Sequence, residues 1–311
     1  MTDLTALITR SETEATLSPL SDHAVLRITG DDAQTFLHGQ FVSDVNALAL
    51  GHGQLTAWCS PQGRVAYLLH LVRISDAYFV LLPASEAVRF VKRLRMFVLR
   101  AKVTIDELPQ YRVYGLQNLA LGALPLVLPQ VQRCVEFDTG CYALGIEHGR
   151  YLLWGEATAM ACTAQRPELA AMPIEIWQYA DITRGYPEIA GNNADTFLPQ
   201  QLNLDLLDVV SFTKGCYPGQ EVVARLKYRG EVKSRLMWCE SSRVCAPGTK
   251  ILLDGVSASA GQVLRSLQIT ADRAVMQVVV DIACVAEGAS HTADGDRLNL
   301  RWPPYYPAIA R

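Results

Sequence analysis

The hydrophobic positions of residues 1–100 predict a mixture of strands and helices. Apolar runs predict four buried strands, at 24–28, 55–59, 65–74 and 78–82. The turn residues between the second and third runs predict a hairpin. A helix is predicted from Ser85, because Val88, Val91, Leu94 and Val98 recur along one of its sides.

The pattern changes twice in the rest of the chain. Residues 103–170 alternate short apolar runs with turns, which predicts a second α/β layer. Residues 236–311 are rich in β-type residues separated by glycine and aspartate turns, which predicts a small β-barrel or sandwich. We therefore expect one region at 1–235, built of two interleaved α/β subdomains, and a β-barrel at 236–311.

Composition narrows the class of protein. Half of the 311 residues are hydrophobic, 19% are charged and the formal net charge is −3, as in compact globular proteins. This charge argues against direct nucleic-acid or membrane binding, and the basic positions at 89–102 form either an anion-binding face or a solvated helix face. No secretory pattern opens the sequence and no run approaches about 20 apolar residues, so we expect a soluble, cytoplasmic protein.

The eight cysteines are scattered and show neither a CxxC pair nor zinc-ligand spacing, so no metal site is expected. In a reducing compartment most of them are small core residues. Cys216 is set apart by its surroundings, the stretch KGCYPGQE at 214–221.

In this stretch Pro218-Gly219 predicts a tight turn, and a helix is expected to begin at Gln220. The helix N-terminus, together with Lys214 and Arg225, would lower the pKa of a nearby thiol and make Cys216 reactive. A Cys-His pair would need a histidine from elsewhere in the chain, and the candidates are His23, His38 and His70. The alternative is that a crowded turn accepts only small residues here, and both interpretations stay open.

A second candidate site precedes this loop. Trp177 lies in a predicted helix and offers either a stacking face for a ligand or a core anchor. The segment 197–205 is rich in amides, which suit a heteroaromatic ring with several donors and acceptors. The sequence lacks the GxxxxGK[ST], GxGxxG, HExxH and GxSxG patterns, which removes support for nucleotide hydrolysis, Rossmann, zinc-protease and α/β-hydrolase chemistry.

Residues 197–230, FLPQQLNLDLLDVVSFTKGCYPGQEVVARLKYRG, resemble the signature of the YgfZ family, which is related to the glycine-cleavage T-protein. The family pattern is KGC-aromatic-x-GQE followed by R-x-K-aromatic-[KR]-G, and 214–221 and 225–230 match it. Further segments that resemble family motifs are 28–45, 57–65, 93–105 and 182–189. The similarity covers most of residues 20–235.

The resemblance implies an α+β, T-protein-like fold with three subdomains around a central cavity and a C-terminal β-barrel. It also implies that the cavity binds a folate, tetrahydrofolate, and that the protein is an accessory factor for the assembly or repair of iron–sulfur proteins, which supports tRNA modification indirectly. The expected partners are iron–sulfur proteins or their assembly machinery. The family has two tryptophans linked to folate binding. This chain keeps one of them as Trp177 and has His23 at the position of the other. Ser60 stands where the family's first hairpin turn commonly has an aspartate.

The candidate site residues fall into two sets. The reactive set is Cys216 with Lys214 and Arg225 as electrostatic partners. The folate-binding set is Trp177, Gln200, Gln201, Asn203, Gly219, Gln220, Glu221 and His23.

Two other functions compete with this interpretation. A folate-dependent aminomethyltransferase of the T-protein type would need a carboxylate on the strand after the first hairpin turn, where this chain has Tyr67 and Leu68. Neither side chain can support an amine-transfer step electrostatically as a carboxylate does. A direct tRNA-binding module would need a phosphate-contacting surface, for which only the 89–102 cluster offers support.

Overall fold

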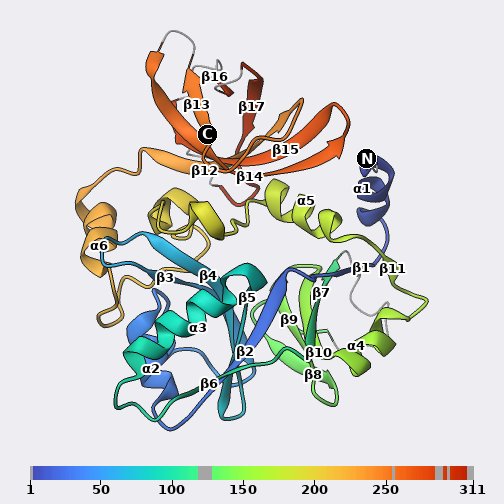
Figure 1. Cartoon of the computed structure of the whole chain (residues 1–311), viewed down its shortest axis with the longest axis vertical. Coiled ribbons are helices and arrows are strands. Elements are labelled where there is room, and N and C mark those ends of the chain that lie inside the picture. The colour runs from blue at the N-terminus through green and yellow to red at the C-terminus, as the bar shows by residue number, and fades with distance from the viewer. Residues whose placement is uncertain (1–2, 118–127, 254–255, 284–289, 293–294, 307–311) are drawn as a thin grey trace.

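The first of three units is a five-stranded antiparallel sheet with the strand order β3-β4-β5-β2-β6 (Figure 1). The computed structural model describes residues 3–117, 128–253, 256–283, 290–292 and 295–306. Helices α2 and α3 bury Phe36, Phe90 and Leu94 in a common core with the strands. The elements of this unit are β2 (His23–Thr29), α2 (Ala33–Gln40), β3 (His52–Cys59), β4 (Val65–Ile74), β5 (Ala77–Pro83), α3 (Ala84–Val98) and β6 (Thr104–Glu107).

The second unit is a six-stranded sheet with the order β11-β1-β7-β10-β9-β8. Its first strand precedes the first unit in sequence and its other strands follow it, so the two sheets alternate along the chain. Only β1 and β11 pair in parallel among the described strands of this sheet. Its elements are β1 (Thr16–Pro19), β7 (Tyr111–Gln117), β8 (Cys134–Asp138), β9 (Cys141–Glu147), β10 (Arg150–Glu156), α4 (Ala157–Ala164) and β11 (Ala170–Ala171).

The third unit is a closed barrel with the order β12-β15-β14-β13-β16-β17. Alternating residues such as Met237, Cys239, Val278 and Val280 fill its interior, as the period of two in a strand requires. The strands are β12 (Ser234–Ser241), β13 (Lys250–Leu253), β14 (Val256–Thr270), β15 (Arg273–Asp281), β16 (Ser290–Thr292) and β17 (Arg297–Arg301). The predicted α+β fold with a C-terminal barrel is confirmed.

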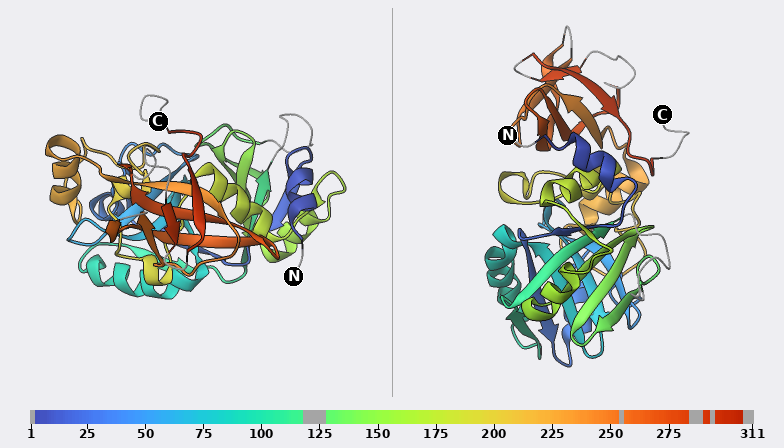
Figure 2. Two further views of the ribbon diagram at one scale, coloured as in Figure 1. Left: turned by 90° about the horizontal axis from the view of Figure 1, so that it is seen from above. Right: turned by 90° about the vertical axis from the view of Figure 1, so that its right-hand side faces the viewer.

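Helix α5 (Ile174–Arg184) lies between the barrel and the two sheets (Figures 1 and 2). It packs on β1 from one side, on β14 and β15 from the other, and on α1 (Thr5–Ser11). Segments close to both termini reach this layer: the Leu4 amide donates to the Ile269 carbonyl, and the Tyr305 hydroxyl donates to the Gly185 carbonyl at 2.8 Å. The centre of the molecule is therefore built from residues far apart in sequence.

The local predictions are confirmed where the apolar pattern is strong. The first hairpin pairs Ala57 with Leu68 and Trp58 with Tyr67, α3 begins one residue before Ser85, and α6 (Gln220–Arg229) begins at Gln220 as expected. Two short 3-10 helices, η1 (Gly191–Asn193) and η2 (Pro199–Leu202), occupy the amide-rich region. In the part of the chain that the structure describes, no helix has the length and apolar character needed to cross a membrane.

Candidate functional site

A cavity lies between the two sheets and the end of α5. It has two adjoining compartments, of about 70 Å³ and 410 Å³, whose walls share Leu55, His70, Ile146 and Tyr186. The smaller compartment adds leucines from β4, β5 and β10, together with His23, Trp177, Asp181 and Glu188. The larger one adds the polar side chains of Gln54, Gln132 and Asp208. The cavity thus combines apolar walls with a few polar groups, as ligand sites generally do.

The wall formed by α5 is held by a buried cation, Arg150, which is 1% exposed. Its guanidinium donates to Asp181 Oδ1 at 2.6 Å and lies 4.1 Å from the centre of the Trp177 ring. Gly115 approaches the same ring so closely that a β-carbon there would lie 2.1 Å from Cε3. Trp177 is 3% exposed, so it is both a core anchor and a wall of the cavity. The expected open stacking face is covered by Arg150.

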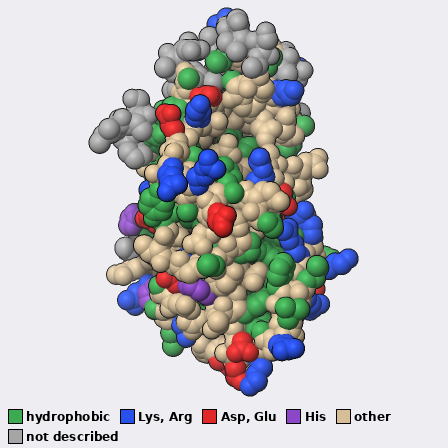
Figure 3. Space-filling model, turned by 90° about the vertical axis from the view of Figure 1, so that its left-hand side faces the viewer, with side chains coloured by type: hydrophobic (Ala, Val, Ile, Leu, Met, Phe, Trp, Pro, Cys, Tyr) green, Lys and Arg blue, Asp and Glu red, His purple; other side chains and the backbone are tan. Residues whose placement is uncertain are grey.

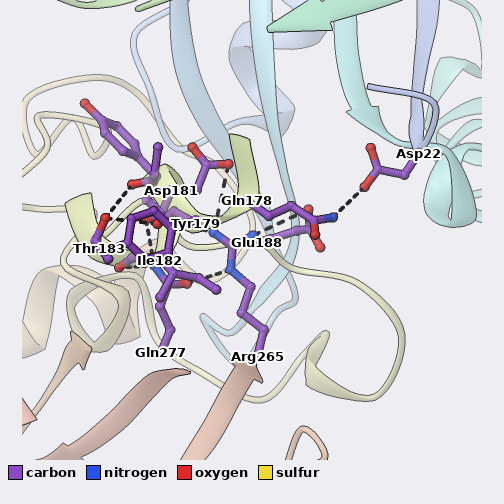
Figure 4. A network of polar contacts seen from close by, with 12 residues as sticks. Asp22, Gln178, Tyr179, Asp181, Ile182, Thr183, Glu188, Arg265 and Gln277 are labelled. Atoms are coloured by element: carbon purple, nitrogen blue, oxygen red, sulfur yellow. Dashed lines mark hydrogen bonds and ion pairs between the residues drawn. The ribbon is translucent and has the colours of Figure 1, made fainter. Parts of the chain in front are cut away.

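The end of α5 is fixed by the barrel (Figure 4). Gln277 of β15 donates through Nε2 to the carbonyls of Asp181, Ile182 and Tyr186. Arg265 of β14 donates to the Tyr186 carbonyl at 2.8 Å and lies 3.8 Å from the Glu188 carboxylate. The barrel therefore positions the turn that carries Tyr186 and Glu188 into the cavity.

Two histidines line the cavity. His23 begins β2 and its Nδ1 lies 2.7 Å from Asp22 Oδ1, while Gln178 of α5 donates to the other oxygen of that carboxylate. His23 also lines a second hollow of about 340 Å³, together with residues of α3 and β7. Burial lowers the pKa of His70 to about 4, with repulsion from His23 as the next cause. His70 is thus a neutral donor and acceptor at physiological pH.

Lowering the pH from 7 to 4 should lower the free energy of unfolding because of His70. An unfolded chain takes up this proton near pH 6.5 and the folded protein only near pH 4, so the unfolded state gains protons first. The contribution is complete above pH 6.5 and is lost as the pH falls to 4, by about 2–3 kcal/mol. Urea unfolding across this range should show the loss in the wild type and not in His70→Gln. Parallel pH profiles for these two proteins would contradict it, and His148→Gln, on an exposed turn, serves as the matched control.

The KGCYPGQE loop lies away from this cavity wall, against the first sheet. The ammonium of Lys214 is buried and donates to three carbonyls, those of His38, Phe41 (2.6 Å) and Ser43 (3.2 Å). Burial lowers the pKa of Lys214 to about 8, while the Asp44 carboxylate acts in the opposite direction. Lys214 therefore holds the loop onto the 38–43 segment. The sequence predicted Lys214 only as an electrostatic partner of Cys216.

The other residues of the loop lie at the surface or at its edge. Cys216, Glu221 and Arg225 are exposed, and Gly219 is the residue before α6 with φ +80°. Gln220 donates to the Lys214 carbonyl at 3.4 Å. Of the three histidines considered, His38 is the one that packs at this loop: its Nε2 would lie 3.9 Å from a β-carbon on Gly215, the residue before Cys216.

A chain of polar contacts joins the loop to the cavity. Lys214 binds the Ser43 carbonyl, the Ser43 hydroxyl donates to Thr56 at 2.6 Å, and Gln54 donates to the Ser43 hydroxyl at 2.7 Å. Gln54 lines the larger compartment. The loop and the cavity are thus separate sites that share one set of buried hydrogen bonds.

The amide residues do not join Trp177 in the cavity. Gln200 and Asn203 are fully buried and donate to the carbonyls of Val223 (2.7 Å) and Leu236 (2.9 Å), which ties their segment to α6 and to the barrel. Gln201 accepts from the Leu198 amide and lines a different hollow. Gln200, Gln201 and Asn203 do not line the cavity that contains Trp177 and His23, because their side chains form hydrogen bonds with backbone groups elsewhere.

Sequence reasoning missed Arg150, Asp181 and Gln54 as parts of the site. Arg150 precedes the uncharged run YLLWG of its strand, and a charge beside such a run is a signal of a buried ion pair. Asp181 and Gln54 carry no comparable signal. Seven cysteines are described, and Cys162 is exposed like Cys216, while the other five are buried as expected; Cys284 lies outside the described residues. No group of three or more potential metal ligands occurs among the described residues.

Comparisons with known proteins bear on the family and the fold. The sequence matches none of the protein-family models against which it was compared. The tRNA-modifying protein YgfZ of Edwardsiella ictaluri is 32% identical over 308 residues, which cover 93% of this chain and 91% of that protein. Its counterpart from Escherichia coli O139:H28 is 33% identical over 279 residues, covering 86% and 85%.

A solved structure agrees in fold. The glycine cleavage system aminomethyltransferase T from Bartonella henselae superposes with a TM-score of 0.78 at 15% identity, covering 96% of this chain and 88% of that protein. It supports the fold alone, whereas the two sequence matches extend over most of both chains. The chain belongs to the family of tRNA-modifying proteins named YgfZ.

Proposed function

We propose that this protein binds a reduced folate, tetrahydrofolate, in the cavity at the end of α5 and acts as an accessory factor for iron–sulfur proteins. The observation that carries the proposal is the cavity itself, which lies at the centre of a fold shared with an aminomethyltransferase of the glycine cleavage system. The name of its relatives, tRNA-modifying protein, agrees with indirect support of tRNA modification through client enzymes.

The residues of the cavity fit a pterin-like group. Such a ring has two apolar faces and an edge of donors and acceptors, and the walls offer Leu55 and Ile146 for the faces. Along the edge, Gln54 supplies an amide and His70 a neutral imidazole, while Glu188 supplies a carboxylate. When bound, the folate would supply a carrier for one-carbon units, and these side chains would hold and orient it.

A transferase reaction has little support from strand β4. The Tyr67 ring packs in the core of the first sheet, where it stacks on Trp58 at 5.5 Å and meets Phe90 edge to face at 5.2 Å. Leu68 does line the smaller compartment, with an apolar side chain. The strand therefore offers no carboxylate at the two positions where the T-protein reaction is thought to need one. Asp181 lines the cavity too, but Arg150 already neutralises it.

Filling the cavity should weaken folate binding. Leu55 lies where the two compartments meet, so Leu55→Trp should weaken tetrahydrofolate binding at least about tenfold in anaerobic calorimetry, since an inserted ring occupies the ligand's volume. Leu50→Trp, at an exposed position nearby in sequence, should bind as the wild type does. Absence of binding by the wild type, or equal binding by Leu55→Trp, would refute the folate site.

The accessory role is tested with the same variants in a bacterial strain that lacks its own YgfZ protein. Leu55→Trp and Cys216→Ser should fail to restore thiolated tRNA, whereas Leu50→Trp and Cys162→Ser should restore it. Cys162 is the matched control because it is the other exposed cysteine among the described residues. Full restoration by Cys216→Ser would contradict the predicted reactive role of Cys216 while leaving the folate site standing.

A further inference from the structure

Helix α6 presents one face to solvent. Val223 is its single buried residue, and Val222, Arg225, Tyr228 and Arg229 follow one another at helical spacing on another side. Tyr228 is 66% exposed and Val222 39% exposed. We call this set the α6 face.

The tyrosine on this face is oriented rather than free. Its ring meets Phe212 edge to face, with the ring centres 6.2 Å apart, and Lys227 Nζ lies 5.2 Å from the centre of the Phe212 ring. Contacts of this kind restrict the side chain while leaving most of the ring in water. An aromatic ring that is held and exposed is a surface on which another flat ring can stack.

The cations around this ring outnumber the carboxylates of the same segment, Glu221 and Glu231, by four to two. Arg225, Lys227, Arg229 and Lys233 fall within nine sequence positions, and none of them makes an ion pair with another residue that the structure describes. Figure 3 looks onto the side that carries α6 and shows lysine and arginine side chains gathered across its middle, with hydrophobic ones beside them. A local positive field therefore exists despite the net charge of −3.

The basic cluster at 89–102 differs, because most of its charges are satisfied internally. Its partners are Glu86 for Arg89 (2.6 Å), Asp195 for Arg93 (3.7 Å), the Ile105 carbonyl for Arg95 (2.8 Å) and Asp31 for Lys102 (3.0 Å). The sequence singled out this cluster as the one basic surface, whereas the structure leaves more unpaired charge around α6.

We propose that the α6 face binds an unpaired stretch of nucleic acid, with a base stacked on Tyr228 and phosphates held by Arg225 and Arg229. An exposed aromatic ring with arginines on the same helix combines a stacking surface with positive charge, and single strands are bound by this combination. A protein partner would need a larger apolar centre than one ring and one valine provide. This site is separate from the folate cavity and does not depend on the function proposed for it.

The test is fluorescence anisotropy with labelled single-stranded RNA and DNA of one sequence, each of about 12 nucleotides. Tyr228→Ala should weaken binding of the single strand at least about fivefold, because each stacked base contributes that much. The double variant Arg225→Gln/Arg229→Gln should also lower the slope of log Kd against log salt by about 0.7 for each cation removed. Tighter binding of the RNA would identify RNA as the ligand of the face, tighter binding of the DNA would identify DNA, and equal binding would show that it accepts either strand.

Three controls make the result decisive. Lys92→Gln/Arg100→Gln removes two exposed cations, one within α3 and one two residues after its end, and should leave binding unchanged. Unchanged melting temperatures will show that the variants are folded, since all the positions are exposed. Equal binding by Tyr228→Ala, an equal loss in the α3 variant, or tighter binding of a duplex than of the single strand would overturn the proposal. The proposal would also be overturned if a glutamate-rich peptide bound to the protein and lost affinity in Tyr228→Ala while the RNA and DNA did not.

Discussion

Replacing Arg150 with methionine should lower the free energy of unfolding by about 3–5 kcal/mol. The change removes the closer of two guanidinium groups beside the Asp181 carboxylate, which lies 2.6 Å from Arg150 and 4.0 Å from Arg265. It also removes the cation that covers the Trp177 ring. Urea unfolding measures the loss, and tetrahydrofolate binding should weaken in the fraction that stays folded because α5 forms a wall of the cavity.

Arg184→Met is the matched control for this prediction. Arg184 also pairs with a carboxylate, that of Glu147 at 2.8 Å, but its side chain is largely exposed, so its loss should cost less than about 1 kcal/mol. Adding Asp181→Asn to Arg150→Met should recover part of the stability, since the negative charge that lost its closer partner is then gone. Equal losses in the two single arginine variants would show that Arg150 does not hold the centre of the molecule.

Replacing Gly219 with alanine should destabilise the protein by about 3 kcal/mol or more. A β-carbon at this position would lie 2.4 Å from the Ser60 carbonyl oxygen and 2.5 Å from Gly63 Cα, and both are backbone atoms that cannot turn aside. The backbone also has φ +80°, which L-residues rarely adopt. The cost measures how tightly the loop around Cys216 packs against the turn of the first hairpin.

Gly140→Ala separates the two causes. Gly140 has φ +68°, but a β-carbon added there would meet no atom within 4 Å, so only the backbone cost of about 1–2 kcal/mol should appear. If the Gly219 and Gly140 variants were equally stable, the packing of the loop against residues 60–63 would contribute nothing. Thermal unfolding followed by circular dichroism suffices for the comparison.

Strong periodicity explains which parts of the fold could be predicted. The hairpin of β3 and β4, the helix from Ser85 and the barrel after 236 follow from apolar spacing and turn residues, which act over a few positions. The arrangement of the units around a cavity was predicted from the resemblance to a family, because no local signal says that β1 (Thr16–Pro19) belongs to a sheet whose last strand is β11 (Ala170–Ala171).

The site was harder to predict because the orientation of loop side chains depends on backbone groups that are far away in sequence. Lys214 and Cys216 are two residues apart, yet one points into three carbonyls of the 38–43 segment and the other into solvent. Gln200 and Asn203 were expected beside Trp177, but carbonyls of Val223 and Leu236 take their amides. Arg150 was identified as part of the site only from the structure, since its partner Asp181 lies on another element.

The hydrogen bonds that fix the end of α5 have a consequence for synthesis on the ribosome. The carbonyls of residues 181–186 are translated well before their partners: Arg265 follows about 80 residues later and Tyr305 about 120 residues later, a delay of several seconds at about 5–20 residues per second. A nascent chain therefore holds both sheets long before the barrel can close over α5. The turn that carries Tyr186 and Glu188 into the cavity is therefore fixed only after the barrel has formed.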